Sequence, residues 1–390
     1  MKCFFLPFHC YSGGNDRLLH FYAPVHLSSS SCQTLRKRFP SYFLSLSYLP
    51  PYILSVHKKS KMTTSIPDDT LAAVLKKWLT PANCEKLDLD GYLVLEDRPL
   101  TDDLAAEFLR EIKHCFHHVE GGKIPNQVEF LTSEGPLKLV KPHIFECDLH
   151  QQAIRSQLPL FDDLFNHQLS ALVELFRDRL TSCEDLVPFA DAADAAKAIT
   201  LKLQMNEGGA FPWHYDNPSR PNKRRLTMAV YLTDEWREEV GGEIVLWPFL
   251  GQPVKVQPSY NTVVLFKSDA TLHKVLPVQS AVQCTRYCFT VWFDGFMTNT
   301  DEDQYLKVSH LQTSAIPLLR RSPLQRTLSR AVYEEEYRTA LRDCFGDGSV
   351  AYKISLHEHN VRLAELLKNE KVRQFVDELK LYREDLCNTE

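Results

Sequence analysis

The chain has 390 residues, of which 44% are hydrophobic and 24% charged, and its formal net charge is -5. This composition suits one large or two ordinary globular domains, and it excludes a chain that is disordered throughout. Residues 1–61 hold eight Lys and Arg against one acid, so residues 62–390 hold the other 37 basic and 49 acidic side chains and carry a net charge of -12. Because nucleic-acid binding needs clustered cations, we do not expect a nucleic-acid partner.

The cysteines and the first 61 residues bear on where the protein is found. Eleven cysteines at irregular spacing, with no Cys-x-x-Cys pair, favour reduced thiols and a cytosolic or nuclear protein. Prolines interrupt the most apolar stretch of residues 1–61, so we expect no membrane helix there. We interpret 1–61 as a disordered extension, or as upstream sequence wrongly joined to a chain that begins at Met62. An organelle transit peptide is disfavoured because a clear amphipathic pattern is missing.

Residues 62–197 are predicted to form a mainly helical support region. Helix-start signals and apolar residues at helical spacing define most of its elements. The expected elements are a helix begun at Ser65–Asp69, a strand at Gly91–Leu95, a helix from Thr101 to about Phe116, short strands and loops in 121–150, and a long helix from Ala153 to Leu180 whose weak point is Pro159.

From residue 198 the pattern changes to short β-rich runs punctuated by Gly, Pro and Asn. The runs are Ala198–Met205, Leu226–Leu232, Glu243–Trp247, Val254–Val256, Thr262–Phe266 and Thr285–Phe293. This spacing is typical of a compact antiparallel barrel or jelly roll, which we place at 198–297. Region 298–390 is predicted to be helical, in about three segments. The fold class is therefore α+β, a double-stranded β-helix (jelly roll) core with flanking N- and C-terminal helices.

One group of residues in the β-rich part suggests a metal site. His214 and Asp216 stand two positions apart, and such positions in a strand face the same side. His273 could supply a third ligand. Two His and one carboxylate around open coordination positions form the facial triad of non-haem Fe(II) oxygenases. A His-x-Asp pair is expected about once by chance in a chain of this composition, so the surroundings must decide.

The run that begins at Arg286 supplies those surroundings. Strand alternation places Arg286, Cys288, Thr290 and Trp292 on one face. If that face is inward, the guanidinium needs an anionic partner, and a dicarboxylate ligand would match its two-pronged geometry. A surface salt bridge is the alternative. Tyr231 could donate its hydroxyl to the same carboxylate, or it could be a core aromatic with another partner.

Taken together, the motifs resemble the catalytic core of the 2-oxoglutarate/Fe(II) dioxygenases, and most closely the prolyl 4-hydroxylase group of the hypoxia-sensing type. They are His214-x-Asp216, Tyr231-Leu232, Gly241-Gly242-Glu243, Leu265-Phe266 leading to His273-x-Val275, and Arg286-Tyr-x-x-Thr290-Val-Trp292. The resemblance covers about residues 198–295.

The resemblance implies a role for each matching residue. His214, Asp216 and His273 match the iron ligands. Arg286 matches the partner of the distal carboxylate of 2-oxoglutarate, with Tyr231 and Thr290 as hydroxyl groups near it. Gln204 stands where the family frequently has Tyr, so its amide would contact the co-substrate instead. Substrate-side contacts are expected at Arg224 and Ile244, and the loop Asn217–Lys223 is either a substrate contact or an ordinary solvated loop.

The implied function is hydroxylation of a prolyl residue in a protein or peptide, coupled to decarboxylation of 2-oxoglutarate to succinate. The implied cofactors are Fe(II), 2-oxoglutarate, dioxygen and L-ascorbate. Two alternatives remain open: the same chemistry on a non-prolyl or small-molecule substrate, and a non-catalytic jelly-roll binding module. Oligomeric state is not indicated by the sequence, and no membrane association is expected.

Overall fold

The computed structural model describes residues 9–11, 18–20, 70–132, 135–218, 221–279, 284–296 and 305–389. Most of the extension at 1–61, Met62 and the helix-start signals at Ser65–Asp69 lie outside the described residues. Two short strands, β1 (His9–Tyr11) and β2 (Leu18–His20), form a small sheet with β14 (Leu306–Lys307) in the order β14-β1-β2. No helix within the described ranges is both long enough and apolar enough to cross a membrane.

Threonine caps set the starts of the first three helices. These are α1 (Leu71–Trp78), α2 (Pro81–Asp90) and α3 (Asp102–His118), and each is preceded by a Thr whose side-chain oxygen accepts a hydrogen bond from a backbone N–H of the first turn. Gly91 ends α2 in the left-handed conformation, with φ 85°, and the chain then enters β3 (Tyr92–Leu95). The strand predicted at Gly91–Leu95 and the helix predicted from Thr101 are both confirmed.

The helix predicted from Ala153 to Leu180 is broken near Pro159, as the sequence suggested, and it is also divided further along, which was not expected. The segment is divided into α4 (Gln152–Arg155), α5 (Pro159–Asp163), the π-helix η1 (Leu164–Gln168) and α6 (Leu169–Arg179). Pro159 stands in the first turn of α5, where its missing N–H costs nothing. A short 3₁₀ turn, η2 (Thr181–Cys183), and α7 (Ala192–Ala198) follow. Residues 121–150 also differ from expectation, because they form one long hairpin of β4 (Ile124–Thr132) and β5 (Gly135–Asp148).

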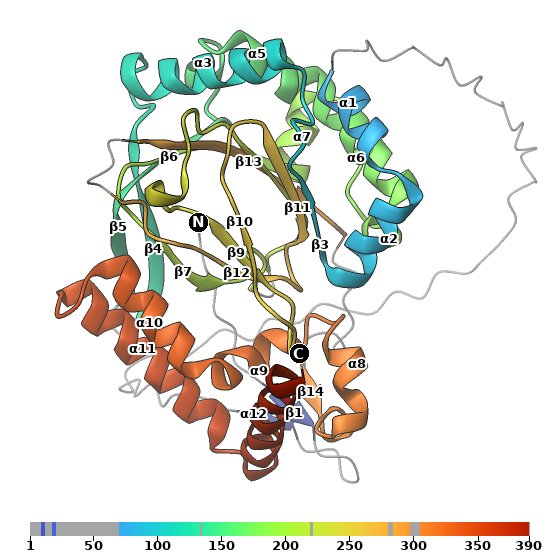
Figure 1. Ribbon diagram of the computed structural model, residues 1–390, viewed down its shortest axis with the longest axis vertical. Coiled ribbons are helices and arrows are strands. Elements are labelled where there is room, and N and C mark those ends of the chain that lie inside the picture. Colours follow the sequence, from blue (N-terminus) through green and yellow to red (C-terminus); the bar gives the residue numbers. More distant parts are fainter. Residues whose placement is uncertain are drawn as a thin grey trace, which may run out of the picture. The chain divides into compact units, whose positions relative to one another are not determined.

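Two antiparallel sheets form the centre of the fold (Figure 1). The larger has the order β3-β11-β8-β13-β6-β5-β4, and the smaller the order β10-β9-β12-β7. Their remaining strands are β6 (Ile199–Asn206), β7 (Phe211–His214), β8 (Arg224–Tyr231), β9 (Ile244–Trp247), β10 (Val254–Val256), β11 (Thr262–Lys267), β12 (Leu272–Val275) and β13 (Arg286–Asp294); a 3₁₀ turn, η3 (Glu238–Val240), precedes β9. The jelly-roll core is confirmed, and all six predicted β runs correspond to strands. Two four-residue strands lie outside these six runs: β7, which the placement of His214 in a strand had assumed, and β12.

Helices cover the outer face of each sheet. The N-terminal helices pack on the larger sheet, where the ring of Phe289 lies 4.8 Å from that of Phe108 and 5.2 Å from that of Phe161. The region after residue 305 contains two 3₁₀ turns, η5 (Val308–His310) and η6 (Thr313–Ala315), and five helices rather than about three. These are α8 (Ile316–Leu319), α9 (Gln325–Val332), α10 (Glu334–Phe345), α11 (Val350–Leu367) and α12 (Glu370–Thr389).

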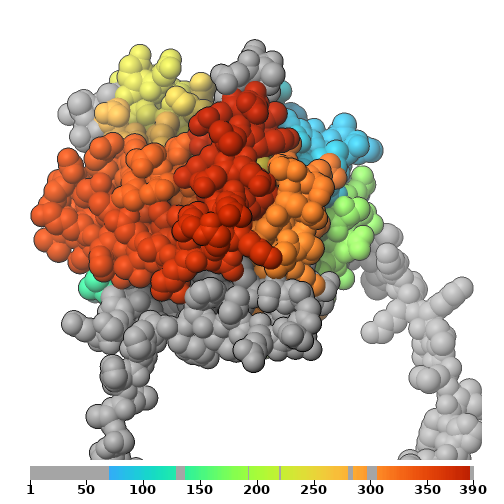
Figure 2. All heavy atoms as spheres, turned by 90° about the horizontal axis from the view of Figure 1, so that it is seen from below, coloured from blue at the N-terminus to red at the C-terminus, as the bar shows by residue number. Residues whose placement is uncertain are grey.

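These C-terminal helices bury the outer face of the smaller sheet. Trp213 of β7, Trp247 of β9 and Leu272 of β12 share one apolar cluster with Tyr333 and Phe375. Figure 2 shows the helical region, in orange to red, as one continuous part of the surface. Packing therefore fixes the sheet that carries β7 and β12 between these helices on one side and the interior of the jelly roll on the other.

Candidate functional site

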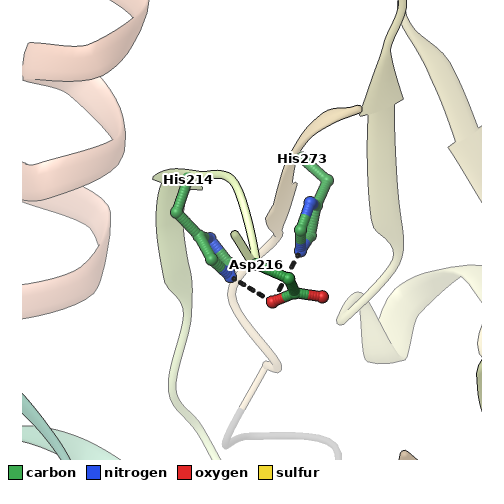
Figure 3. Close-up of side chains that lie close together, drawn as sticks. All are labelled: His214, Asp216 and His273. Carbon is green, nitrogen blue, oxygen red and sulfur yellow. Dashed lines mark ion pairs between the residues drawn. The ribbon is translucent and has the colours of Figure 1, made fainter. Parts of the chain in front are cut away.

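His214, Asp216 and His273 come together at the edge of the smaller sheet (Figure 3). His273 of β12 is the register partner of His214 at the end of β7, so the two rings lie side by side with centroids 4.2 Å apart. The Nε2 atoms of His214 and His273 lie 3.6 and 3.7 Å from Oδ1 of Asp216. One ion could therefore reach all three donor atoms. The sequence predicted that Asp216 lies in the same strand as His214. In the structure, Asp216 lies in the turn that begins after His214.

Neighbouring groups orient each of the three side chains. Nδ1 of His214 lies 2.8 Å from the carbonyl of Pro212, and Nδ1 of His273 lies 3.1 Å from that of Thr271. An N–H donated to each carbonyl leaves the Nε2 lone pair free for a metal. The hydroxyl of Thr227 donates to Oδ2 of Asp216 at 2.8 Å, which leaves Oδ1 facing the histidines. This donor set fits a divalent transition metal, and with open positions it fits Fe(II).

The charge states of the ligands also suit a cation. Burial, followed by the nearby charge of His214, lowers the pKa of His273 to about 4, so its ring is neutral at physiological pH. Burial alone would raise the pKa of Asp216, but the charges of His273 and His214 outweigh it and hold that pKa well below its usual range. A neutral imidazole at His273 and a carboxylate at Asp216 are forms that bind a metal.

A pocket of about 120 Å³ adjoins the triad, between the two sheets. Arg286, Cys288, Thr290 and Trp292 all line it, on the single face of β13 that strand alternation predicts. The other lining residues are Asn126, Gln127, Val128, Lys141, Glu146, Gln204, Phe211, Pro212, His214, Asp216, Thr227, Ala229, Tyr231, Ile244, Phe266, His273 and Val275. Its walls are mainly apolar, with a few polar groups that could orient a small acid.

Arg286 is the main cation of the inner wall. It is only 2% exposed, and its guanidinium carbon lies 4.8 Å from the centre of the Tyr231 ring. Its Nε is buried without a hydrogen-bond partner, and within the described part of the chain it makes no ion pair with a carboxylate. The geometry therefore does not support the alternative that Arg286 forms a surface salt bridge. Gly242 has φ 77°, and a Cβ there would lie 3.1 Å from Cδ of Arg286, so a glycine at this position leaves room for this side chain.

Gln204 and Cys288 continue the wall across adjacent strands. Cys288 is the register partner of both Tyr231 and Gln204, and its thiol lies 3.4 Å from Oε1 of Gln204. Ile244 also lines the pocket, whereas Arg224 does not. The Arg224 guanidinium lies over the Trp292 ring at 4.4 Å, and it donates to the backbone carbonyl of Asp216 at 3.4 Å.

A polar wall from the β4–β5 hairpin escaped the sequence analysis. Lys141 donates to Asn126 at 2.8 Å, Asn126 donates to Glu146 at 2.6 Å, and Lys202 of β6 donates to Glu146 at 2.9 Å. Strand alternation could not have found it, because Lys141 and Glu146 of β5 stand five positions apart and the β4–β5 pairing contains a register shift. In the loop Asn217–Lys223, Pro221 and Lys223 are exposed as in a solvated loop, whereas Asn217 is only 3% exposed and differs from that expectation.

Comparison with known proteins agrees with this site. Residues 201–294 match the family model described as the 2OG-Fe(II) oxygenase superfamily. The chain is 34% identical to a prolyl 4-hydroxylase of Phytophthora capsici of known structure, with 80% of this chain and 95% of that one covered and a TM-score of 0.64. The chain belongs to the 2OG-Fe(II) oxygenase superfamily and is a 2-oxoglutarate-dependent dioxygenase.

Two further solved structures are more distant. A prolyl hydroxylase of Trichoplax adhaerens, in complex with a hypoxia-inducible-factor peptide, is 18% identical over 57% of this chain and 91% of its own, with a TM-score of 0.43. A prolyl 4-hydroxylase of Pseudomonas putida is 20% identical over 55% and 97%, with a TM-score of 0.38. A search of curated proteins found no match.

Proposed function

We propose that the protein hydroxylates a prolyl residue of a protein or peptide substrate. His214, Asp216 and His273 would hold Fe(II), and bound Fe(II) would supply the oxidising chemistry with dioxygen and 2-oxoglutarate. The observation that carries the proposal is the buried guanidinium of Arg286, whose Nε has no hydrogen-bond partner, in the same pocket as the triad. The prolyl assignment is supported by the extensive match to the Phytophthora capsici prolyl 4-hydroxylase.

The residues of this chain would then have separate tasks. Arg286 and Tyr231 would bind the distal carboxylate of 2-oxoglutarate, with Thr290 and Gln204 beside it. The apolar side chains of the pocket would exclude water from the reacting groups. Ile244 would contact substrate within the pocket, and Arg224 would act from beside Trp292. Ascorbate would keep the iron reduced.

The proposal also includes the organisation and location of the chain. Residues 198–297 would form the catalytic core, with 62–197 and 298–390 as supporting regions and 1–61 as an extension. A reducing compartment such as the cytosol or nucleus is supported by the seven cysteines whose side chains the structure describes, since all seven are free.

The test is succinate formation by the full chain with Fe(II), 2-oxoglutarate and ascorbate, with and without a set of Pro-containing peptides. We expect turnover that rises with a peptide, hydroxyproline in that peptide, and loss of both metal binding and turnover in His214→Ala. Full activity in His214→Ala would remove the triad assignment. Peptide-independent turnover that rises only with a small molecule would replace the prolyl substrate by another one.

A further inference from the structure

The turn that carries Asp216 is held from outside the jelly roll by helix α9. Arg326 of α9 donates through NH1 to the carbonyl of Asn217 at 2.8 Å and to its Oδ1 at 3.1 Å. One residue earlier, Gln325 accepts a hydrogen bond from the hydroxyl of Tyr215 at 3.2 Å. The residues on both sides of Asp216 are thus bound to α9.

Asn217 connects this helix to the rest of the site. Its N–H donates to the carbonyl of Ser268 at 2.8 Å, and its side-chain amide donates to the carbonyl of Arg224 at 2.8 Å. With the two bonds from Arg326, all its polar groups are paired, and it is almost fully buried. The turn therefore has few other conformations available while Arg326 is in place.

Arg326 is itself fixed before it reaches the turn. Its Nε donates to the carbonyl of Pro323 at 2.9 Å, in the turn that precedes α9. Gln325 is also anchored, because its amide nitrogen donates to the carbonyl of Arg320 at 3.1 Å. A preorganised donor loses less side-chain entropy on binding than a free one, so its contact is more effective.

We propose that Arg326 is a positioning residue that sets the metal affinity of the triad. His214 and His273 are aligned by a strand ladder, whereas Asp216 lies beyond the end of β7 and is held by its turn and by the hydroxyl of Thr227. Without Arg326 the backbone of the turn would have to be ordered when the metal binds, and the metal affinity would fall. The C-terminal helical region is then part of the active site, although in the described structure it lines no part of the pocket.

This inference rests on the proposed iron site, and the test separates the two. Mn(II) is titrated into the full chain of wild type, Arg326→Ala and Arg326→Lys, with exposed Arg321→Ala as the matched control. Loss of a group that supports a metal ligand costs about 10–100-fold in affinity, and Arg326 acts one residue away, so we expect about a tenfold higher Kd in Arg326→Ala. Lysine can reach one of the two oxygens and should give about threefold. With saturating metal, kcat should return to within about twofold of wild type.

A folded Arg326→Ala variant with the wild-type Kd would overturn the inference. If that variant does not fold, Tyr215→Phe decides, because it keeps the ring and removes only the hydroxyl that Gln325 accepts from. We expect about a threefold higher Kd there, and an unchanged Kd would overturn the inference. Absence of Mn(II) binding by the wild type would instead remove the proposed iron site.

Discussion

At the scale of single residues, the pocket contains a buried cation, Arg286, that an anion would satisfy. Arg286 is buried, has an unpaired Nε and has the Tyr231 ring against it. Leaving such a guanidinium without an anion is costly, so the free protein stores part of the binding energy for a carboxylate. Arg286 is therefore buried from water and still able to bind the carboxylate of a ligand.

Arg286→Ala should therefore weaken the use of 2-oxoglutarate while sparing the metal. We expect the half-saturating 2-oxoglutarate concentration to rise at least about 100-fold, since a buried charged hydrogen bond contributes several kcal/mol. Mn(II) affinity in the absence of 2-oxoglutarate should stay near the wild-type value. Arg286→Lys keeps the charge but not the two-pronged guanidinium, so its half-saturating 2-oxoglutarate concentration should lie between those of the wild type and Arg286→Ala. An unchanged 2-oxoglutarate requirement in a folded Arg286→Ala variant would show that Arg286 is structural.

Much of the site was predictable from local sequence, and the predictions that were wrong have a physical reason. The period of two along β13 placed Arg286 and Thr290 on one face correctly, because that period depends only on the strand itself. The burial of Asn217 was not predictable, since its partner Arg326 lies 109 residues away in the chain. Asp216 was assigned to a strand because the i, i+2 rule does not reveal where the strand ends.

At the scale of elements, local sequence signals identified the six β-rich runs, but they did not show every place where an element begins or ends. Thr101 marked a helix start because an N-cap acts on the adjacent turn. Gly91 was predicted only as the start of a strand, and the helix α2 that it ends was not predicted. The π-helix η1 has no such signal, so the segment from Ala153 to Leu180 resembled one helix. The strands β7 and β12 have only four residues each, and pairing with their neighbours rather than propensity defines them.

A substitution on the side of β13 that faces away from the pocket should lower stability without changing ligand binding. Phe289 is fully buried against Phe108 and Phe161, on the face opposite Cys288 and Thr290. Phe289→Ala should lower the free energy of unfolding by about 3–5 kcal/mol, and Phe289→Leu by less than about 1.5 kcal/mol. Urea unfolding measures both. A similar loss in the two variants would mean that the cavity is not the cause.

The C-terminal helices should make the protein less stable in acid. Burial, followed by the charges of Arg330, Arg338 and Arg362, lowers the pKa of His359 to about 3, against about 6.5 when unfolded. The unfolded chain then binds the proton first, so this contribution to stability is complete above pH 6.5 and is lost as the pH falls towards 3.

His359→Gln tests this directly. Between pH 6.5 and pH 5, the wild type should lose about 2 kcal/mol more of its free energy of unfolding than the variant does. Exposed His357→Gln is the matched control and should behave as the wild type. Equal pH dependence of the wild type and His359→Gln would contradict the prediction.

At the scale of the whole molecule, the jelly roll depends on the helices that follow it. Trp213, Trp247 and Phe249 face an apolar cluster completed by Tyr333, Phe375 and other residues of the C-terminal helices. Tyr333 also forms a hydrogen bond to the segment that follows β9, because the N–H of Leu250 donates to its hydroxyl at 2.7 Å. The cluster is large enough that its exposure would make the protein associate.

A chain ended at residue 304 should therefore aggregate or lose cooperative unfolding. Size-exclusion chromatography and thermal unfolding are the measurements, and a chain ended at Leu386 is the control. We expect the control to remain monodisperse to the same degree as the full chain. A chain ended at residue 304 that unfolds cooperatively and stays in solution would show that the jelly roll is independent of the helices.

The position of Arg326 in the chain has a consequence for synthesis on the ribosome. All three triad residues have been made once His273 is added, but Arg326 follows 53 residues later. At about 5–20 residues per second, the nascent chain spends roughly 3–10 seconds with a complete ligand set and an unsupported Asp216 turn. If Arg326 sets the metal affinity, we expect iron to bind more tightly once the C-terminal helices have left the ribosome than while the jelly roll is still forming.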